Sequence, residues 1–369
     1  MKIVLSGGGT AGHINPAISI AKKILEQDKN AQILFVGTPR GMENALVAKE
    51  GFPIRHVDVM GFRRKLTAEN LKVAYLALKS VGEAKKILKE FRPDVVVGTG
   101  GYVSWPVLRA ASKMGIPTLI HEQNAVPGLT TRKLSKTVDV VCTSFAESEA
   151  LLPCDKKKIC LTGNPVDPSV GKLSRAACRT KLGISAPFVL SYGGSLGARA
   201  INEAAFAMAK DYACHSPIFH THAFGVRNYP EFEERERTER ICRFGNVRFL
   251  DYIFDMPVQM CAADLVVCRA GAITLAELAV MKKPAILIPS PNVTDNHQYK
   301  NALVFKEKGA ALLLEEKDLT PEGLTAAVKS LLSDPAALRT MSENMAKLAL
   351  PHALDEICKN VWTLAKRNK

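Results

Sequence analysis

Short apolar runs, many of them β-branched, alternate along the chain with amphipathic stretches of helical period. In the first half, these runs cover residues 3–5, 33–36, 95–97, 118–120 and 138–141. The pattern pauses at a proline- and glycine-containing segment, 163–168, and resumes with runs at residues 188–190, 247–249, 265–267 and 285–288. Strands that alternate with helices form βαβ units around a parallel sheet. The pattern therefore predicts an α/β protein of two Rossmann-like halves that meet at the pause.

The second half opens as the first does, with an apolar run that leads into glycines at residues 193–197 and then a helical stretch at 198–210. The tail, residues 352–369, carries Leu354, Ile357, Val361 and Leu364 at helical spacing, which predicts one closing helix. We expect domains at residues 1–162 and 163–345, followed by a helical segment at 346–369.

Composition fits two cores: the chain has 369 residues, of which 47% are hydrophobic. The apolar run after Met1 is too short for a signal peptide, and residues 95–108 are interrupted by glycines and a proline and fall short of the roughly 20 residues that span a bilayer. Nine cysteines without a CxxC pair indicate reduced, buried thiols. The net charge of +14 predicts an acidic partner without identifying it.

The loop at residues 7–13 matches GxGxxG after a strand, a pattern in which glycines let the backbone close on a diphosphate. A dinucleotide site also needs an acidic residue at the end of the second strand, but that strand ends Val36-Gly37-Thr38-Pro39. NAD binding is therefore disfavoured. Thr10 and His13 suggest chemistry in this loop instead, although a purely structural role for His13 stays open.

Two further polar segments follow predicted strands of the first half. Residues 98–102 offer glycine amides and the Tyr102 hydroxyl to a second phosphate-bearing group, with a tight structural turn as the alternative. Residues 121–124, His-Glu-Gln-Asn, end another strand, where open α/β sheets bind ligands. Four consecutive polar side chains are not expected in a core.

In the second half, residues 266–274 lead from a strand into a helix, and Glu277 follows within about one turn. Arg269 is suited to phosphates and Glu277 to a ribose diol, with stabilisation of the helix dipole as the alternative role for Glu277. Residues 295–298, Asp-Asn-His-Gln, offer amide and imidazole groups to sugar hydroxyls. The chain has no DxD or HExxH motif, so no metal is indicated, although an assisting divalent cation stays possible.

Taken together and in order, these segments resemble the bacterial MurG family of N-acetylglucosaminyltransferases, which complete lipid II in peptidoglycan synthesis and have the GT-B fold. The resemblance spans essentially the whole chain and is carried by residues 8–13, 100–104, 121–124, 163–166, 193–199, 269–274 and 295–298. It implies two Rossmann-like domains facing a cleft, with the C-terminal helix returning to the first domain.

The resemblance also implies roles for individual residues. The implied donor-binding set is Thr10, Ala11, Gly12, His13, Asn124, Ser195, Ile253, Arg269, Ala272, Ile273, Thr274, Glu277, His297 and Gln298. The implied acceptor-diphosphate set is Gly8, Gly9, Gly100, Gly101 and Tyr102. One position departs from the family: Asp167 stands where an arginine commonly contacts the donor, so that contact is not carried over.

The implied reaction is inverting transfer of N-acetylglucosamine from UDP-N-acetylglucosamine to the C4 hydroxyl of lipid I, with His13 as the candidate base. The implied partners are these two substrates and other cell-wall and division proteins, with no nucleic acid. The implied location is the cytoplasmic face of the plasma membrane. Residues 60–92 carry nine basic against three acidic residues beside Leu71, Ala74, Tyr75, Leu78 and Val81, which predicts a basic face that rests on anionic lipid or, alternatively, an ordinary solvated helix.

Two other functions share this architecture. One is a UDP-N-acetylglucosamine 2-epimerase, which needs no lipid acceptor, and the other is a noncatalytic membrane scaffold. The epimerase leaves the basic face and the paired glycine loops of the first half unexplained. The scaffold leaves the polar residues His13, Asn124, Arg269, Glu277 and Gln298 unexplained.

Overall fold

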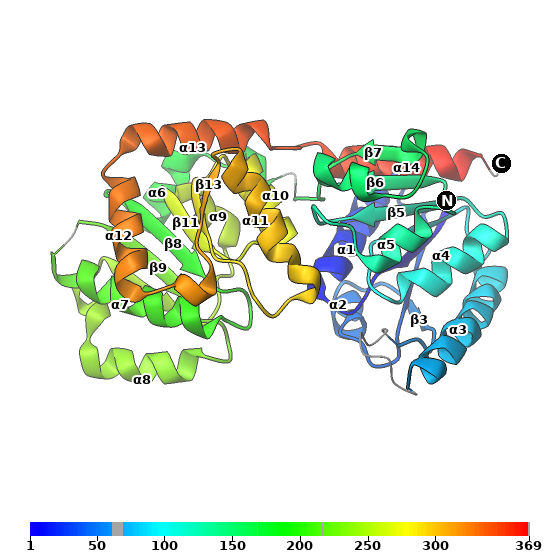
Figure 1. Cartoon of the computed structure of the whole chain (residues 1–369), viewed down its shortest axis with the longest axis horizontal. Helices are drawn as coiled ribbons and strands as arrows, with labels where there is room; N and C mark the ends of the chain where they lie inside the picture. The colour runs from blue at the N-terminus through cyan, green and yellow to red at the C-terminus, as the bar shows by residue number, and fades with distance from the viewer. Residues whose placement is uncertain (61–68, 168, 216, 368–369) are drawn as a thin grey trace. The chain divides into compact units, whose positions relative to one another are not determined.

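The computed structural model describes residues 1–60, 69–167, 169–215 and 217–367 and divides the chain into two compact units (Figure 1). Unit 1 comprises Met1–Asp167 together with Pro351–Lys369, and unit 2 comprises Pro168–Leu350. The divisions fall a few residues after those expected from the sequence, at 162/163 and 345/346. The first lies in the proline-containing segment where the strand pattern pauses.

Unit 1 is built on a seven-stranded sheet in the order β3-β2-β1-β4-β5-β6-β7, and its strands pair in parallel. The strands are β1 Lys2–Ser6, β2 Gln32–Gly37, β3 Ile54–His56, β4 Val95–Gly98, β5 Thr118–Glu122, β6 Val140–Thr143 and β7 Ile159–Leu161. The chain progresses outward on one side from β1 and on the other from β4. The topological switch point, where such sheets bind ligands, therefore lies between β1 and β4.

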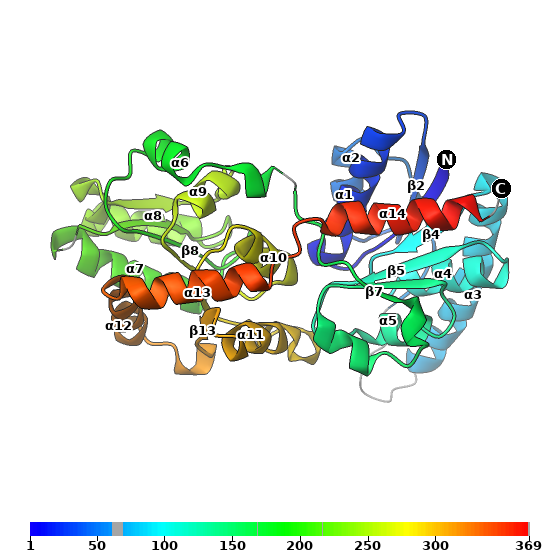
Figure 2. The ribbon, with the colours of Figure 1, turned by 90° about the horizontal axis from the view of Figure 1, so that it is seen from above.

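Helices cover both faces of this sheet. They are α1 Ala11–Gln27, α2 Glu43–Lys49 and α14 Ala353–Lys366 on one face, α3 Glu69–Phe91, α4 Ser104–Lys113 and α5 Leu129–Leu134 on the other, with the short turns η1 Ala146–Leu151 and η2 Lys156–Lys158. Figures 1 and 2 both show α14 alongside α1. Its buried stripe, which includes Ile357, Val361 and Leu364, joins the core that Ile20 and Ile24 of α1 form over the sheet. The predicted closing helix is confirmed, and it belongs to unit 1.

Unit 2 repeats the plan with a six-stranded parallel sheet in the order β10-β9-β8-β11-β12-β13. The strands are β8 Phe188–Tyr192, β9 Phe219–Ala223, β10 Val247–Leu250, β11 Leu265–Cys268, β12 Ala285–Leu287 and β13 Ala311–Leu313. Its switch point lies between β8 and β11. Two parallel Rossmann-like sheets confirm the predicted GT-B class.

The helical segments of unit 2 are η3 Val170–Lys172, α6 Arg175–Leu182, α7 Arg199–His215, α8 Tyr229–Glu239, η4 Ile241–Phe244, α9 Met256–Ala262, α10 Ala272–Val280, η5 Thr294–Asn296, α11 His297–Glu307, η6 Glu316–Asp318, α12 Pro321–Leu332 and α13 Pro335–Lys347. Helices α7 and α12 close one face of the sheet, where Ile201, Tyr212 and Leu324 are fully buried. Because helix and strand faces share this apolar core, the loops at the carboxyl ends of the strands are held on a rigid base.

The predicted basic face is described only in part. Residues 61–68 and the side chains of Leu71, Ala74 and Tyr75 lie outside the described residues. On the described part of α3, Leu78 is 74% exposed, whereas Val81 packs against the core. Within the residues that the structure describes, no helix is long and apolar enough to cross a membrane.

Candidate functional site

Two glycine loops meet at the switch point of unit 1. Gly7–Gly9 follow β1, and Thr99–Tyr102 follow β4. Gly101 has a φ of +77°, and a Cβ at this position would lie 2.1 Å from the carbonyl oxygen of Gly8. The Ser104 hydroxyl oxygen lies 2.7 Å from the carbonyl oxygens of both Ser6 and Gly100, and its one proton can be donated to either. The two loops are therefore packed backbone to backbone, which only glycine permits at this approach.

His13 is fixed beside these loops. Its Nδ1 lies 3.1 Å from the Gly8 carbonyl oxygen and 3.2 Å from the Thr10 hydroxyl. A carbonyl can only accept, so Nδ1 carries a proton and the lone pair of the neutral ring is on Nε2. A Cβ at Gly100 would lie 3.2 Å from that Nε2, so the basic nitrogen faces the second glycine loop. The arrangement places the lone pair of His13 beside the two packed glycine loops.

The structure thus brings the predicted residues of unit 1 together at one edge of the sheet. Thr10, Ala11, Gly12 and His13 begin α1 directly after the first glycine loop. The Thr99 hydroxyl donates to the His13 carbonyl at 2.6 Å, which ties this helix start to the second loop. The Tyr102 ring lies close to Gly9, with Cε1 3.4 Å from the position of an added Cβ.

Residues 121–124 are an internal network rather than an open polar cluster. His121 is fully buried, its Nε2 donates to the Gly163 carbonyl at 2.9 Å, and burial lowers its pKa to about 4. Gln123 donates to the Thr99 carbonyl at 2.8 Å. Glu122 accepts from the backbone of Asn124 at 3.1 Å. The expectation that these four polar side chains do not belong to a core is therefore corrected for His121, Glu122 and Gln123, which are buried and shape the loops. Asn124 is half-buried.

A buried carboxylate that the sequence did not reveal lies beneath the first glycine loop. Glu43 is 1% exposed and accepts from the amide and the hydroxyl of Thr38 at 2.8 and 2.7 Å. A Cβ at Gly8 would lie 3.1 Å from the Glu43 carboxyl carbon. An acidic side chain therefore does lie beside the end of β2, but it comes from α2. Because its carboxylate is buried and hydrogen-bonded to Thr38, it is not available to bind a ribose as the acid of a dinucleotide site does.

Unit 2 places part of its predicted set at the switch point between β8 and β11, whereas Ile253 follows the edge strand β10. Ser195 is exposed in the glycine loop after β8, and Ile253 is 4% exposed in the loop after β10. Ala272, Ile273 and Thr274 form the first turn of α10, directly after β11 and the connecting residues 269–271. Backbone amides at a helix start attract anions.

Glu277 lies on the second turn of α10 and is half-buried. Its carboxylate is close enough to Tyr192, at the end of β8, to affect the pKa of the tyrosine hydroxyl. Burial raises this pKa well above its ordinary value, and the nearby Cys268 thiol and Glu277 carboxylate raise it further. Thr274 hydrogen-bonds to the same hydroxyl. The side chains of β8, β11 and α10 therefore meet under this part of the site.

Arg269 is placed differently from its expected role on phosphates. Its Nη1 donates to the carbonyls of Ile288 and Pro289, both at 3.1 Å, and its Nη2 forms an ion pair with Glu316. The Arg269 side chain is only 15% exposed. The guanidinium thus ties together the segments after β11, β12 and β13, and its charge is neutralised within the protein.

The segment before α11 has an unusual backbone. Asp295 and Asn296 have φ values of 57° and 51°, in the left-handed region that aspartate and asparagine tolerate better than most residues. His297 Nδ1 donates to the Thr294 carbonyl at 2.8 Å, and Gln298 Oε1 accepts from the amide of Ser290 at 2.9 Å. Helix α11 begins at His297. These side chains hold the loop that follows β12.

Asp167, the departure from the family pattern, is exposed at the end of the first segment of unit 1. Asn164, three residues earlier, is buried and donates to the Gln123 carbonyl at 3.0 Å. Among the residues with described side chains, no three histidine, cysteine, aspartate or glutamate side chains are grouped to hold a metal ion.

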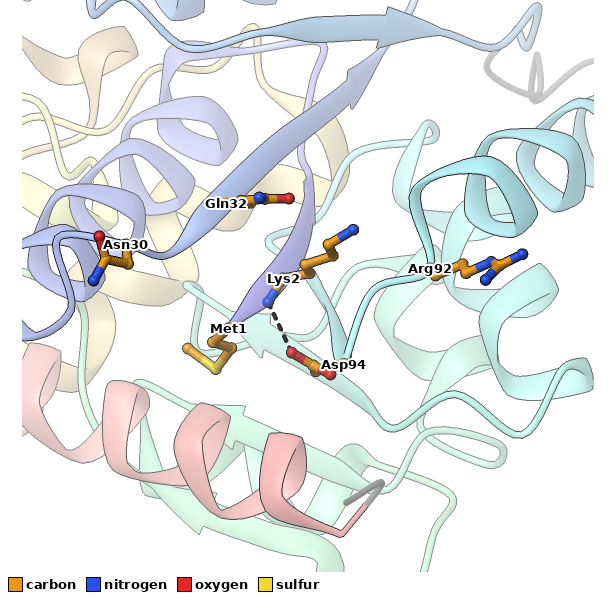
Figure 3. A pocket seen from close by; sticks show the side chains of 6 residues that line it. All are labelled: Met1, Lys2, Asn30, Gln32, Arg92 and Asp94. Carbon is orange, nitrogen blue, oxygen red and sulfur yellow. Dashed lines mark hydrogen bonds between the residues drawn. The ribbon is translucent and has the colours of Figure 1, made fainter.

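A pocket of about 380 Å³ lies elsewhere in unit 1 (Figure 3), lined by Met1, Lys2, Asn30, Gln32, Arg92 and Asp94. These residues stand at the amino ends of β1, β2 and β4, the edge opposite the glycine loops. The Lys2 amide donates to Asp94 at 2.8 Å, and the N-terminal ammonium pairs with Asp28 at 3.3 Å. Since sheets of this type bind ligands at the carboxyl ends of their strands, we do not assign the substrates to this pocket.

Comparison with known families decides the classification. Residues 3–143 match the glycosyltransferase family 28 N-terminal domain, and residues 188–357 match the glycosyltransferase family 28 C-terminal domain. The chain belongs to glycosyltransferase family 28. The family's two domains coincide with the two Rossmann-like sheets, and the predicted enzyme class is confirmed.

Relatives within family 28 match nearly end to end. The UDP-N-acetylglucosamine–N-acetylmuramyl-(pentapeptide) pyrophosphoryl-undecaprenol N-acetylglucosamine transferase of Thermoanaerobacter sp. is 46% identical over 368 residues, covering 99% of this chain and 100% of the relative. The crystal structure of Acinetobacter baumannii MurG has a TM-score of 0.79 at 31% identity, and the match covers 98% of this chain and 99% of that one.

A more distant structure shares the fold alone. The UDP-GlcNAc 2-epimerase of Neisseria meningitidis has a TM-score of 0.66 at 14% identity, and the match covers 98% of this chain and 100% of that one.

Proposed function

We propose that this family 28 enzyme transfers N-acetylglucosamine from UDP-N-acetylglucosamine to the C4 hydroxyl of undecaprenyl-diphospho-N-acetylmuramyl-pentapeptide, lipid I, to give lipid II. The observation that carries the proposal is the 46% identity, over essentially the whole of both chains, to a transferase named for these substrates. The 2-epimerase shares only the fold at 14% identity, so it does not support epimerisation here.

Unit 2 would bind the donor. The glycine loop with Ser195 and the first turn of α10, Ala272–Thr274, offer a hydroxyl and backbone amides to the diphosphate. Glu277 would accept from the ribose hydroxyls and the Ile253 backbone would meet the uracil. His297 and Gln298, in the segment that follows β12, would approach the sugar.

Arg269 has a different task in this proposal. Because its guanidinium is paired with Glu316 and bonded to the carbonyls of Ile288 and Pro289, it would shape the donor pocket rather than bind phosphate. The positive potential at the departing diphosphate would then come mainly from backbone amides at the start of α10.

Unit 1 would bind the acceptor diphosphate on Gly8, Gly9, Gly100, Gly101 and Tyr102. The C4 hydroxyl oxygen attacks the anomeric carbon, the bond from that carbon to the UDP oxygen breaks, and the configuration inverts. The hydroxyl proton passes to Nε2 of His13, the ring nitrogen that the Nδ1 hydrogen bond to Gly8 leaves as the acceptor. Thr10, Ala11, Gly12 and Asn124 are further proposed donor-binding residues.

The test is transfer of radiolabel from UDP-N-acetylglucosamine to lipid I by the purified full chain. Labelled lipid II that forms only with both substrates supports the proposal. Conversion of UDP-N-acetylglucosamine to its 2-epimer without lipid would show an epimerase instead. Binding of UDP without either reaction would indicate a noncatalytic scaffold.

The lipid acceptor requires access to a membrane, and we infer peripheral binding by α3 at the cytoplasmic face of the plasma membrane. On its described part, α3 carries exposed Leu78 and, about two to three turns further along, the exposed Lys85, Lys86 and Lys89. Basic side chains near an anionic surface each contribute about 1 kcal/mol to binding. Other cell-wall and division proteins are further proposed partners at this surface.

Sedimentation with vesicles tests the membrane proposal. Full-length protein should pellet with phosphatidylglycerol vesicles and much less with phosphatidylcholine vesicles. Lys85→Glu with Lys86→Glu should weaken this binding severalfold, whereas the matched reversal Lys306→Glu with Lys308→Glu, on an exposed stretch of unit 2, should have a smaller effect. Equal pelleting with both lipids would contradict the proposal.

A further inference from the structure

The glycine loop after β8 is held by the neighbouring loop after β9. The amide of Val226 donates to the Ser195 carbonyl at 3.2 Å, and the Asn228 side chain donates to the Leu196 carbonyl at 3.1 Å. Gly197 has a φ of +82°, and a Cβ there would lie 2.0 Å from the Phe224 carbonyl oxygen. The loop expected to carry the donor diphosphate therefore rests directly on the backbone of Phe224 and its successors.

The approach is equally close from the other side. Gly225 has a φ of +79°, and a Cβ at this residue would lie 2.0 Å from the backbone nitrogen of Gly197. Where two backbones are in van der Waals contact, a shift of one loop toward the other would cause a clash, so each loop restricts the position of the other at this point. The position of the Phe224 carbonyl is thus transmitted to the glycine loop.

A chain of buried polar groups ends on that carbonyl. Ser191, Asn202 and His222 are each fully buried. Asn202 Nδ2 donates to the Phe224 carbonyl at 2.9 Å, and its Oδ1 lies 3.1 Å from His222 Nε2. The Ser191 hydroxyl lies 2.6 Å from His222 Nδ1. Three buried side chains, from β8, α7 and β9, thus connect in sequence to the support of the loop.

The direction of every hydrogen bond in this chain is determined. The Asn202 amide nitrogen donates to Phe224, so its oxygen must be the atom that accepts from His222 Nε2–H. A neutral ring then accepts at Nδ1 from the Ser191 hydroxyl. Burial lowers the pKa of His222 well below its ordinary value, and His220 lowers it further, so the ring is neutral. His222 therefore links the two residues: it accepts from the Ser191 hydroxyl at Nδ1 and donates to Asn202 from Nε2.

We propose that His222 is a positioning residue for donor binding: through Asn202 and the Phe224 carbonyl it holds the Gly193–Gly197 loop in the conformation that receives the diphosphate. This inference rests on the proposed function, since the ligand of the loop is the diphosphate of UDP. His222 itself is fully buried and touches no substrate. Its effect is on the shape of the loop, not on the chemical step.

Two substitutions at this position separate the two hydrogen bonds. His222→Gln keeps a distal amide that can donate to Asn202, whereas His222→Asn places its amide too short to reach and removes that donor. We expect His222→Asn to weaken UDP binding and raise the KM for the donor about tenfold, the effect of one lost buried hydrogen bond, with kcat changed about twofold or less. His222→Gln should retain most of the affinity.

His220 supplies a matched control. It is 1% exposed on the same strand, and its Nε2 lies 2.7 Å from Ser191, but no hydrogen bond joins it to Asn202. His220→Asn should lower the melting temperature as His222→Asn does, yet leave UDP affinity within about twofold. Calorimetric titration with UDP and a thermal melt of each variant give the two readouts. Equal UDP affinity for His222→Asn and the wild type would overturn the proposal.

Amide hydrogen exchange tests the loop without nucleotide. Exchange at residues 194–197 should rise severalfold in His222→Asn and remain near wild type in His220→Asn. Ser191→Ala is a smaller change that removes the hydroxyl bond to His222, and it should raise exchange at the same residues if His222→Asn does not fold. Equal exchange in all variants would overturn the inference. A wild-type chain that binds UDP but forms no lipid II would instead contradict the proposed function.

Discussion

Hydrogen-bond partners, rather than residue type, decide what the polar side chains do. Gly8 fixes the tautomer of His13 and leaves Nε2 as the basic atom, facing Gly100. The same reasoning applied to His121 makes Nε2 a donor to Gly163, deep in unit 1. Two histidines of unit 1, His13 at the start of α1 and His121 near the end of β5, thus have opposite roles: Nε2 accepts in the first and donates in the second.

His13→Ala removes the proposed base. We expect kcat to fall about a hundredfold or more, the usual contribution of general base catalysis, while the affinity for UDP changes little. Steady-state transfer to lipid I and calorimetry with UDP would be measured together. His56→Ala, which removes an exposed imidazole bonded to Asn44 outside the site, is the control. An unchanged kcat in His13→Ala would end the assignment.

Arg269→Met separates a structural role from a phosphate contact. Its loss leaves Glu316 mostly buried without its partner, and we expect unit 2 to lose about 3 kcal/mol of stability. Arg269→Met combined with Glu316→Leu should recover part of that loss. Chemical denaturation gives the stabilities. A single variant of normal stability but much weaker UDP binding would restore the phosphate role instead.

At the scale of elements, α14 shows how a terminal helix becomes part of a distant core. It follows unit 2 in the chain, yet its apolar stripe packs with α1 and over β4 and β5 in unit 1. The stripe could be predicted from the spacing of Leu354, Ile357, Val361 and Leu364. Which sheet it covers depends on contacts between residues more than three hundred positions apart, such as Trp362 with Gln27.

Val361→Ala tests this packing. Val361 is fully buried, and deleting two methyl groups should destabilise unit 1 by about 1–3 kcal/mol. Thr363→Ala, an exposed position on the same helix, is the control and should change stability by less than about 0.5 kcal/mol. Urea denaturation monitored by circular dichroism compares the two. If both variants match the wild type, α14 does not contribute to the core of unit 1.

At the scale of the whole molecule, each unit contains a buried histidine whose side chain is neutral in the folded protein. Burial lowers the pKa of His121 in unit 1 to about 4 and that of His220 in unit 2 to about 3, from an ordinary value of 6.5. Below pH 6.5 the unfolded chain takes up protons that the folded chain does not, so stability falls as the pH decreases toward these values. Above pH 6.5 this contribution is fully present.

We therefore expect both units to melt at lower temperatures as the pH is lowered from 7 to 5. For His121 the full effect across its window is about 3 kcal/mol. Differential scanning calorimetry at several pH values measures it, and His121→Gln should show a weaker pH dependence than the wild type. Identical pH dependence in the two proteins would show that other groups are responsible.

The sequence by itself determined the elements whose signal is local. Apolar runs gave β1, β2, β4 and β5 because strands covered on both faces are continuously hydrophobic. Turn glycines and polar residues after those runs located the loops at residues 7–13, 98–102 and 269–274, since the carboxyl end of a strand can be recognised from its own neighbours. These two local signals were enough to predict the fold class and the edge where ligands bind.

Only the tertiary structure decided what depends on distant partners. β9 escaped the strand pattern because His220, Thr221 and His222 look polar, yet both histidines are buried, where Ser191 hydrogen-bonds to each of them and Asn202 to His222. The charge of Arg269 is neutralised by Glu316, and a buried acid beside the end of β2, Glu43, comes from α2 and binds Thr38. Burial and hydrogen bonding between segments far apart in the chain set these roles, and no local pattern records them.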